Sequence, residues 1–83
     1  MVGSEDWIIN DGKLCKTFVF GSFLEAISFM RKASTEIEKL NHHPEWTNVY
    51  NRVAVSLCTH DKGNSVTDLD YKLAELLDAL FDK

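Results

Sequence analysis

The sequence predicts an α+β fold in which two β-hairpins alternate with two helices, in the order β-β-α-β-β-α. Three observations support this order. An Asp-Gly pair joins two short apolar segments near the N-terminus, which favours a hairpin. Two helix N-cap patterns, at residues 22–25 and 67–70, each lead into an apolar stripe with helical spacing. The segment between the helices, residues 45–59, has the composition of β structure.

Length and composition limit the class of protein. The 83 residues are enough for one domain, 1–83, and their 45% hydrophobic and 27% charged content is typical of a compact globular protein. No apolar run approaches the roughly 20 residues of a membrane span, so we expect a cytoplasmic protein without a membrane partner, with the nucleus left open. The net charge of −4 argues against direct binding of nucleic acid.

The first hairpin and the first helix follow from local signals. Residues 7–9 and 14–20 form the arms around Asn10-Asp11-Gly12-Lys13. We expect Ser22 to cap the helix while Glu25 reaches back to the amide of Ser22. The expected core stripe of this helix is Phe23, Ile27, Met30, Ser34 and Ile37.

Pro44 predicts where the first helix ends. Its ring disfavours the helical conformation for the preceding residue, so His43 should be extended while His42 can still belong to the last turn near Asn41. The two adjacent histidines should therefore point in different directions.

The second helix begins with Thr67-Asp68-Leu69-Asp70, which also has the form of a capping box. The simplest role of Asp70 is therefore that of a capping carboxylate. The stripe expected to face the core follows it: Leu69, Leu73, Leu76, Leu77 and Leu80.

The segment 45–59 decides whether the histidines can meet. As one continuous strand it would hold His43 and His60 about 50 Å apart, at ~3.3 Å per residue. As a hairpin with a turn at Asn51-Arg52, it pairs Tyr50 with Val53 and brings His43 opposite His60. The hairpin also collects the large apolar side chains on one face, so we prefer it.

Three histidines in so short a chain have several interpretations. They can be surface or capping residues, and His42 near a helix C-terminus would gain from the helix dipole. Three imidazoles can also bind catalytic zinc, but adjacent histidines seldom converge on one ion. We read Cys15 and Cys58 as unpaired strand residues. Histidines can also share proton transfer near neutral pH, and their spacing alone does not decide among these roles.

The segments EKLNHHPEW (38–46), NVYN (48–51) and THD (59–61), continuing through Asp70, closely resemble the signature of the pterin-4a-carbinolamine dehydratases. The resemblance begins at Trp7 and covers nearly the whole chain. It implies a four-stranded antiparallel sheet with helices packed on one face, and a homodimer or homotetramer. It also implies dehydration of 4a-hydroxytetrahydrobiopterin to quinonoid dihydropterin, in tetrahydrobiopterin recycling, without metal or cofactor.

The resemblance also implies site residues. The catalytic set is His42, His43, His60 and Asp70. The set that binds the pterin substrate is Glu38, His42, His43, Pro44, Trp46, Thr59, His60 and Asp61. We expect His42 and His60 to be the acid/base pair and His43 mainly to bind substrate, while Glu38 orients an imidazole; its neighbour at i+4 is His42.

Two features depart from the family pattern. Family members commonly carry an additional helix before the tryptophan that matches Trp7, whereas six residues precede it here, so we expect that helix to be absent. We also expect the loop 62–67 to be one residue longer than usual, which affects where Asp70 lies relative to His60. A second kind of function also stays open. Family members in animals serve as dimerisation cofactors of a homeodomain transcription factor through helical surfaces, which would make such a factor the partner.

Overall fold

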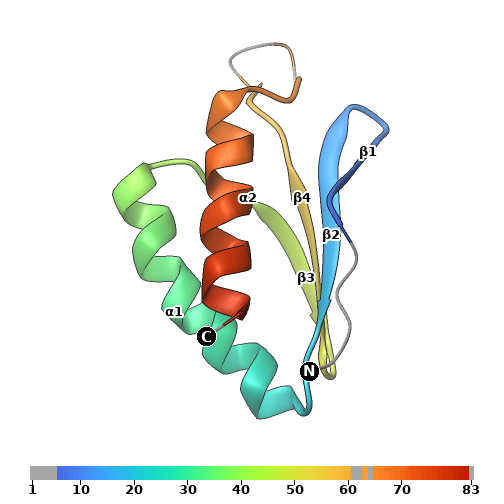
Figure 1. Ribbon diagram of the computed structural model, residues 1–83, viewed down its shortest axis with the longest axis vertical. Helices are drawn as coiled ribbons and strands as arrows, with labels where there is room; N and C mark the ends of the chain where they lie inside the picture. Colours follow the sequence, from blue (N-terminus) through green and yellow to red (C-terminus); the bar gives the residue numbers. More distant parts are fainter. Residues whose placement is uncertain (1–5, 61–62, 64, 83) are drawn as a thin grey trace.

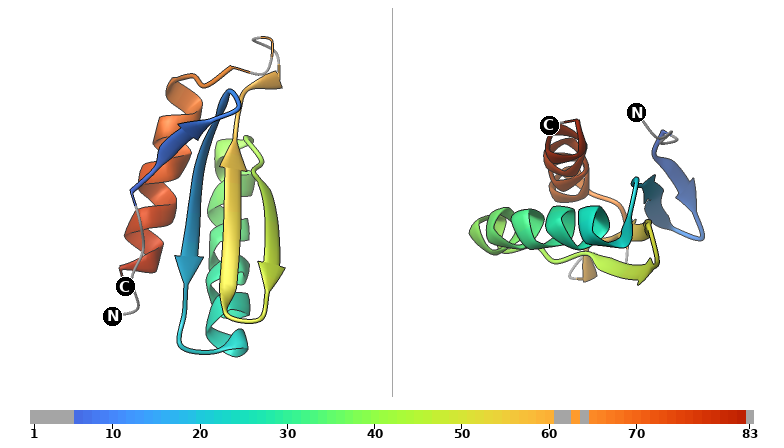
Figure 2. Two further views of the ribbon diagram at one scale, coloured as in Figure 1. Left: turned by 90° about the vertical axis from the view of Figure 1, so that its right-hand side faces the viewer. Right: turned by 90° about the horizontal axis from the view of Figure 1, so that it is seen from below.

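The computed structural model describes residues 6–60, 63 and 65–82. It contains four strands and two helices in the predicted order (Figure 1). Their bounds are β1 Ile8–Asn10, β2 Lys13–Val19, α1 Phe23–Leu40, β3 Glu45–Val49, β4 Arg52–Leu57 and α2 Asp68–Phe81. The strands form one antiparallel sheet in the order β1-β2-β4-β3. Both helices cover the same face of this sheet and leave its other face open (Figure 2). The predicted α+β fold is therefore confirmed.

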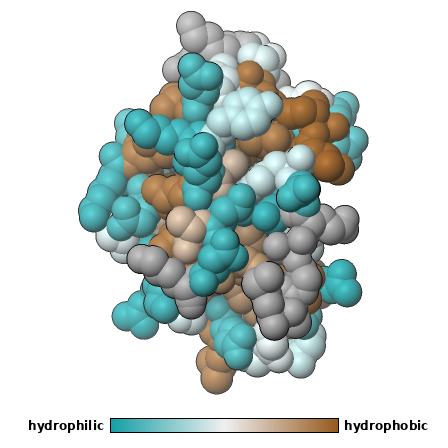
Figure 3. Space-filling view, viewed as in Figure 1, coloured by the Kyte–Doolittle hydropathy of each residue, from teal (hydrophilic) through white to brown (hydrophobic). Residues whose placement is uncertain are grey.

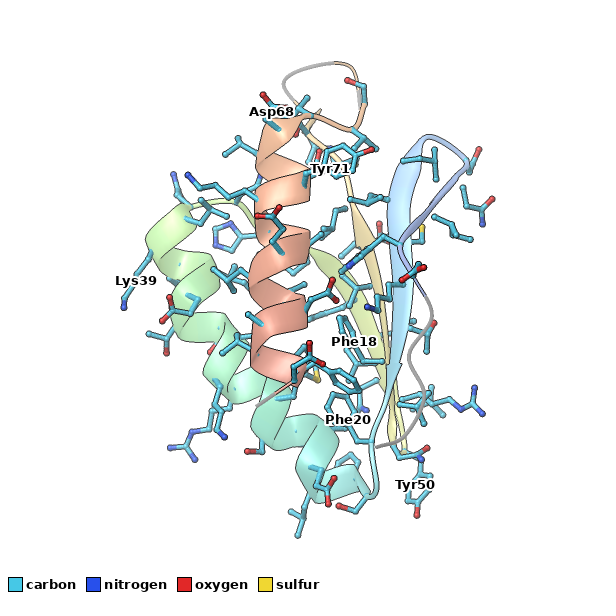
Figure 4. All side chains as sticks on the ribbon, viewed as in Figure 1. Phe18, Phe20, Lys39, Tyr50, Asp68 and Tyr71 are labelled. Carbon is cyan, nitrogen blue, oxygen red and sulfur yellow. The ribbon has the colours of Figure 1, made fainter. Side chains whose placement is uncertain are left out.

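The core lies between the sheet and the helices. Side chains of alternating parity on β2 and β4 point inward, and Phe18, Val53 and Val55 are at most 1% exposed. Phe18 and Phe20 project toward the helices (Figure 4) and pack against Phe29 with ring centroids 5.0 and 5.1 Å apart. This aromatic packing fixes the helices against the central strands.

The buried stripe of α1 differs from the predicted one. Its fully buried residues are Ala26, Phe29, Ala33 and Ile37. Of the predicted stripe, Ile37 is buried and Met30 is partly buried, whereas Phe23 and Ile27 are 47% and 38% exposed. Two stripes with helical spacing overlap here, rotated by about one residue, or roughly 100°. The small alanines let the helix approach the sheet closely, so the stripe with fewer large side chains is the one that packs.

The ends of α1 are held by side-chain and backbone caps. The Ser22 hydroxyl accepts from the Glu25 amide at 3.1 Å, as predicted. The Glu25 carboxylate, however, accepts from the Gly21 amide rather than from that of Ser22. At the other end Asn41 adopts the left-handed conformation (φ 56) and its amide bonds to Ile37 and Glu38 carbonyls. The helix therefore ends before His42, and not between the two histidines as Pro44 alone suggested.

The second hairpin exists, but its predicted register is wrong by two residues. The strands pair Asn48 with Val53 and Trp46 with Val55, so the turn is at Tyr50-Asn51. The Asn48 amide side chain donates to the carbonyls of Tyr50 and Arg52, which stabilises Tyr50 in the left-handed region (φ 51). Because side chains alternate between the two faces of a strand, a shift of two residues leaves every side chain on its predicted face. The predicted faces are therefore correct although the register is wrong.

A polar contact joins the N-terminal segment, β2 and α2. The Lys16 ammonium is 2.7 Å from Asp78 Oδ1, and its side chain is only 7% exposed. The Trp7 indole donates to the other oxygen of Asp78 at 3.0 Å. Lys16 also lies 5.0 Å from the centroid of the Phe18 ring. This contact holds α2 against the edge of the sheet.

The surface is mostly polar on the side shown in Figure 3. Apolar surface is visible over β1, where Ile8 and Ile9 are 60% and 56% exposed (Figure 3). In the part of the chain that the structure describes, no helix is long and apolar enough to cross a membrane.

Candidate active site

A cavity of about 450 Å³ lies at one end of the sheet, where three segments of the chain meet. Its walls come from the α1–β3 connection, the segment that follows β4, and the first turn of α2. These elements converge in the upper half of Figure 1, and Asp68 of that first turn is labelled in Figure 4. The lining residues are Asn41, His42, His43, Pro44, Glu45, Cys58, Thr59, His60 and Leu69. All three histidines of the chain therefore border one cavity.

His42 is held by a buried carboxylate. Its Nε2 is 2.6 Å from Asp70 Oδ1, and the two side chains are 12% and 0% exposed. An ionised carboxylate only accepts hydrogen bonds, so Nε2 carries a proton that it donates to Asp70. The proton on Nε2 leaves Nδ1 as the nitrogen with a lone pair when the ring is neutral. Asp70 therefore selects both the orientation and the tautomer of His42.

Asp70 is kept ionised by its hydrogen bonds. Its Oδ2 accepts from the Thr67 amide at 2.8 Å and from the Thr59 hydroxyl at 2.9 Å. Burial acts to raise the pKa of this carboxyl, but the bonds from His42, the Thr67 amide and Thr59, with the charge of His42, lower it below 3.8. One carboxylate thus makes both of the predicted kinds of contact: Oδ2 accepts from the N-cap amide of Thr67, and Oδ1 accepts from His42.

His43 has a different partner in a different environment. Its Nε2 is 2.6 Å from Glu38 Oε1, and these side chains are 56% and 76% exposed. Glu38 therefore contacts His43, and not its i+4 neighbour His42 as the helical spacing suggested. The reason is the end of α1: the left-handed Asn41 turns His42 away from the helix and toward α2. Solvent weakens the exposed pair, so it holds its imidazole less firmly than Asp70 holds His42.

The chain around His60 is fixed through its neighbour Thr59. The amide of Thr59 donates to the Ser65 carbonyl at 2.8 Å, which closes the loop between them. The Gly63 amide donates to the His60 carbonyl at 3.2 Å. Thr59 is only 8% exposed, so the segment after β4 that carries His60 is anchored in the interior.

An ion pair between Lys13 and Glu45 lies at the border of the cavity. The Lys13 ammonium on β2 is 3.2 Å from Glu45 Oε1 on β3. The hydrogen bond and charge of Glu45 raise the pKa of Lys13. Glu45 also lines the cavity, so this pair places one cation at its rim.

The predicted site residues fall into three groups. His42, His43, Pro44, Thr59 and His60 line the cavity. Glu38 and Asp70 lie behind it and contact the histidines. Trp46 is partly buried against the core and is not part of the lining, and Asp61 lies outside the described residues.

Four lining residues were not predicted to belong to the site: Asn41, Glu45, Cys58 and Leu69. The first three are sequence neighbours of predicted residues, so adjacency was the only signal for them. Leu69 was expected in the core because it continues the leucine stripe, but it is 42% exposed. It lies in the first turn of α2, beyond the buried Leu73, where the helix passes the end of the sheet.

Comparison with known proteins agrees with this geometry. The model of the family described as pterin 4 alpha carbinolamine dehydratase matches residues 2–80. The chain belongs to this family. A relative from Rhizobium leguminosarum bv. trifolii, provisionally named a pterin-4-alpha-carbinolamine dehydratase, is 51% identical over 80 residues, which are 94% of this chain and 78% of that protein. A relative from Opitutus terrae with the same provisional name is 57% identical over 82% of this chain and 70% of its own length.

A solved structure shares the fold of this pterin 4 alpha carbinolamine dehydratase family member. The crystal structure of a transcriptional coactivator/pterin dehydratase from Brucella melitensis superposes with a TM-score of 0.85 at 44% identity. The match covers 93% of this chain and 83% of the Brucella chain. The resemblance read from the histidine motif is therefore confirmed at the level of family and fold.

Proposed function

We propose that the protein is a hydro-lyase that dehydrates a pterin-4a-carbinolamine, 4a-hydroxytetrahydrobiopterin, to quinonoid dihydropterin in the recycling of tetrahydrobiopterin. The observation that carries this proposal is the buried Asp70–His42 pair, 2.6 Å apart, at the wall of a cavity lined by three histidines. Family membership supplies the substrate class, and the cavity supplies groups suited to moving protons.

The reaction needs two proton transfers. The C4a–O bond breaks and the hydroxyl leaves as water after it receives one proton. N5 loses its proton, and its electron pair forms the double bond to C4a. Two imidazoles that exchange protons near neutral pH can divide this work.

His42 is suited to the base role. Asp70 accepts a hydrogen bond from the proton on Nε2, so the lone pair of the neutral ring is on Nδ1, and the carboxylate stabilises the imidazolium that forms when Nδ1 accepts a proton. In our proposal this nitrogen removes the N5 proton. Because His42 is nearly buried and fixed at one ring nitrogen, little reorganisation precedes the transfer.

His60 and His43 have the complementary roles. His60 lines the same cavity from the anchored segment that follows β4, and we assign it the role of the acid that protonates the leaving hydroxyl. His43, more exposed and held by Glu38, mainly binds the substrate. Pro44, Thr59 and Asp61 complete the proposed binding set, and Trp46 stays a predicted member of it.

The proposal extends to assembly and location. The family resemblance implies a homodimer or homotetramer, and we place it in the cytoplasm. The exposed apolar residues Phe23, Leu24 and Ile27 on α1 offer surface for contacts between copies. A transcription-factor partner is the alternative we give less weight, because the Brucella protein's description as a coactivator concerns that protein. The histidines and the carboxylate at the cavity, and not a helical surface, carry our proposal.

A dehydratase assay with freshly generated carbinolamine tests the function directly. The wild-type protein should accelerate appearance of quinonoid dihydropterin over the spontaneous rate. His60→Ala should lower kcat by at least tenfold while thermal melting stays close to wild type, because His60 is exposed at the cavity. A wild-type protein that leaves the spontaneous rate unchanged would remove the enzymatic proposal and favour the transcription-cofactor alternative.

A further inference from the structure

Two threonine hydroxyls form a chain of hydrogen bonds behind the candidate base. Thr59 Oγ1 lies 2.9 Å from Asp70 Oδ2 and 2.6 Å from Thr67 Oγ1. Each hydroxyl has one proton to donate. The ionised carboxylate can only accept, so the Thr59 proton goes to Asp70. Thr67 must then donate to Thr59, and the chain has a single direction from Thr67 through Thr59 to Asp70.

Each member of this chain is fixed by a second contact. The Thr59 amide is bonded to the Ser65 carbonyl, and Thr59 is 8% exposed. Thr67 is the N-cap of α2, and its amide donates to the same Oδ2 that the Thr59 hydroxyl reaches. Asp70 is fully buried. None of these groups needs to reorient to hold the carboxylate.

The two oxygens of Asp70 have separate partners. Oδ2 receives the two donors from the threonines, and Oδ1 faces His42 alone. A hydroxyl that accepts a hydrogen bond becomes a better donor, so the bond from Thr67 strengthens the bond from Thr59 to Asp70. The threonines therefore determine which oxygen is presented to the imidazole, and at what angle.

We propose that Thr67, acting through the hydroxyl of Thr59, is a positioning residue that orients the Asp70 carboxylate and with it the imidazole of His42. Thr67 is not among the residues that line the cavity. Thr59 has the same positioning role and contacts Asp70 directly. Its hydroxyl donates to Asp70 and accepts from Thr67, so both of these hydrogen bonds are made within the protein. The kinetic part of this inference rests on the proposed dehydratase function.

A role in helix capping alone predicts different behaviour. Loss of an N-cap hydroxyl lowers stability but leaves the geometry of a distant imidazole unchanged. Thr67→Val removes the hydroxyl, and Thr67→Ser retains it. Thr67→Gly also lacks the hydroxyl, but glycine is tolerated at N-caps, so this variant keeps the helix start. Thr47→Val, on the exposed face of β3, is the matched control.

The experiment measures kcat, KM and the His42 Nε2–H resonance by NMR on ¹⁵N-labelled protein. Thr67→Val and Thr67→Gly should each lower kcat about fivefold, the effect of one neutral hydrogen bond, with KM within about twofold of wild type. The Nε2–H resonance should move in both variants. Thr67→Ser should restore kcat and the resonance, and Thr47→Val should change neither.

A double-mutant cycle tests the route through Thr59. Thr59→Val leaves the Thr67 cap in place but breaks the chain in its middle, so it should lower kcat by at least as much as Thr67→Val. In the Thr59→Val background, Thr67→Val should lower kcat no further, because the two residues act in series.

Two results would overturn the inference. One is a loss of stability in Thr67→Val and Thr67→Gly while kcat and the His42 resonance stay at wild-type values. The other is multiplication of the two kcat effects in the double variant. If the wild-type protein has no dehydratase activity, the proposed function fails, but the His42 resonance still decides whether Thr67 positions the imidazole.

Discussion

Replacing Asp70 with asparagine should invert the tautomer of His42. Oδ2 of Asp70 accepts from the Thr67 amide and the Thr59 hydroxyl, so an asparagine must place its own oxygen there. Its NH₂ group then occupies the position of Oδ1, 2.6 Å from His42 Nε2, and donates where the carboxylate accepted. The neutral imidazole must give up its proton on Nε2 and carry it on Nδ1, the nitrogen that we assign as the base.

The size of the effect follows from these contacts. Recovering the reactive tautomer requires breaking the new hydrogen bond and turning two N–H groups toward each other, which costs about 3 kcal/mol. That free energy corresponds to a fall in kcat of about 100-fold. Stability should fall less, by about 1–2 kcal/mol, because both bonds to the threonines survive in the variant.

Steady-state turnover of freshly generated carbinolamine measures the first effect, and ¹⁵N chemical shifts of His42 report the tautomer. Asp78→Asn is the matched control, since Asp78 lies on the same helix but pairs with Lys16 away from the cavity. It should keep wild-type kcat. An Asp70→Asn protein that retains more than half of the wild-type kcat, with its proton still on Nε2, would refute the reasoning.

Three further predictions concern the ion pairs. Glu38→Gln should lower kcat no more than about threefold, because its pair with His43 is exposed; a loss as large as that of Asp70→Asn in the same assay would contradict this. Lys16→Met should lower the free energy of unfolding by about 2 kcal/mol in urea melts, since Asp78 keeps only the Trp7 donor; an unchanged melt would show that the pair contributes nothing. The folded pKa of Asp70 is lowered, so the stabilisation by Asp70 is complete above about pH 5 and is lost as the pH falls through that lowered pKa. In urea melts, the difference in the free energy of unfolding between wild type and Asp70→Asn should therefore narrow from about pH 5 to about pH 3, and a constant difference would be inconsistent with the lowered pKa.

Much of the fold could be predicted because its signals are local. The Asp11-Gly12 turn, the Ser22 cap and the alternation on β2 each depend on a few adjacent residues. The face of α1 could not be chosen in this way, because two apolar stripes satisfy the same helical spacing. Packing against the sheet selected the one with small residues at Ala26 and Ala33. The register of the second hairpin likewise depended on side-chain tethers from Asn48 to the turn.

The sequence predicted which residues belong to the candidate site, but not which of their side chains contact one another. The motif predicted His42, His43, His60 and Asp70 as catalytic residues, which stays a prediction, and the structure places the three histidines at one cavity. The spacing along α1 predicted a contact between Glu38 and His42. The left-handed residue Asn41 changes the direction of the chain after the helix, and Glu38 contacts His43 instead. Long-range contacts such as the one between His42 and Asp70, 28 residues apart, have no local signature.

The same left-handed residue, Asn41, makes the contact between His42 and Asp70 dependent on the docking of α2. Because the chain turns away from α1 at Asn41, the partner of His42 comes from the other helix. The imidazole and its carboxylate meet only when the start of α2 has packed against the end of α1. If the proposed role of this pair in dehydration holds, we expect a partly folded molecule with the sheet and α1 formed to be inactive, and turnover to report the attachment of the C-terminal helix before global unfolding is detected.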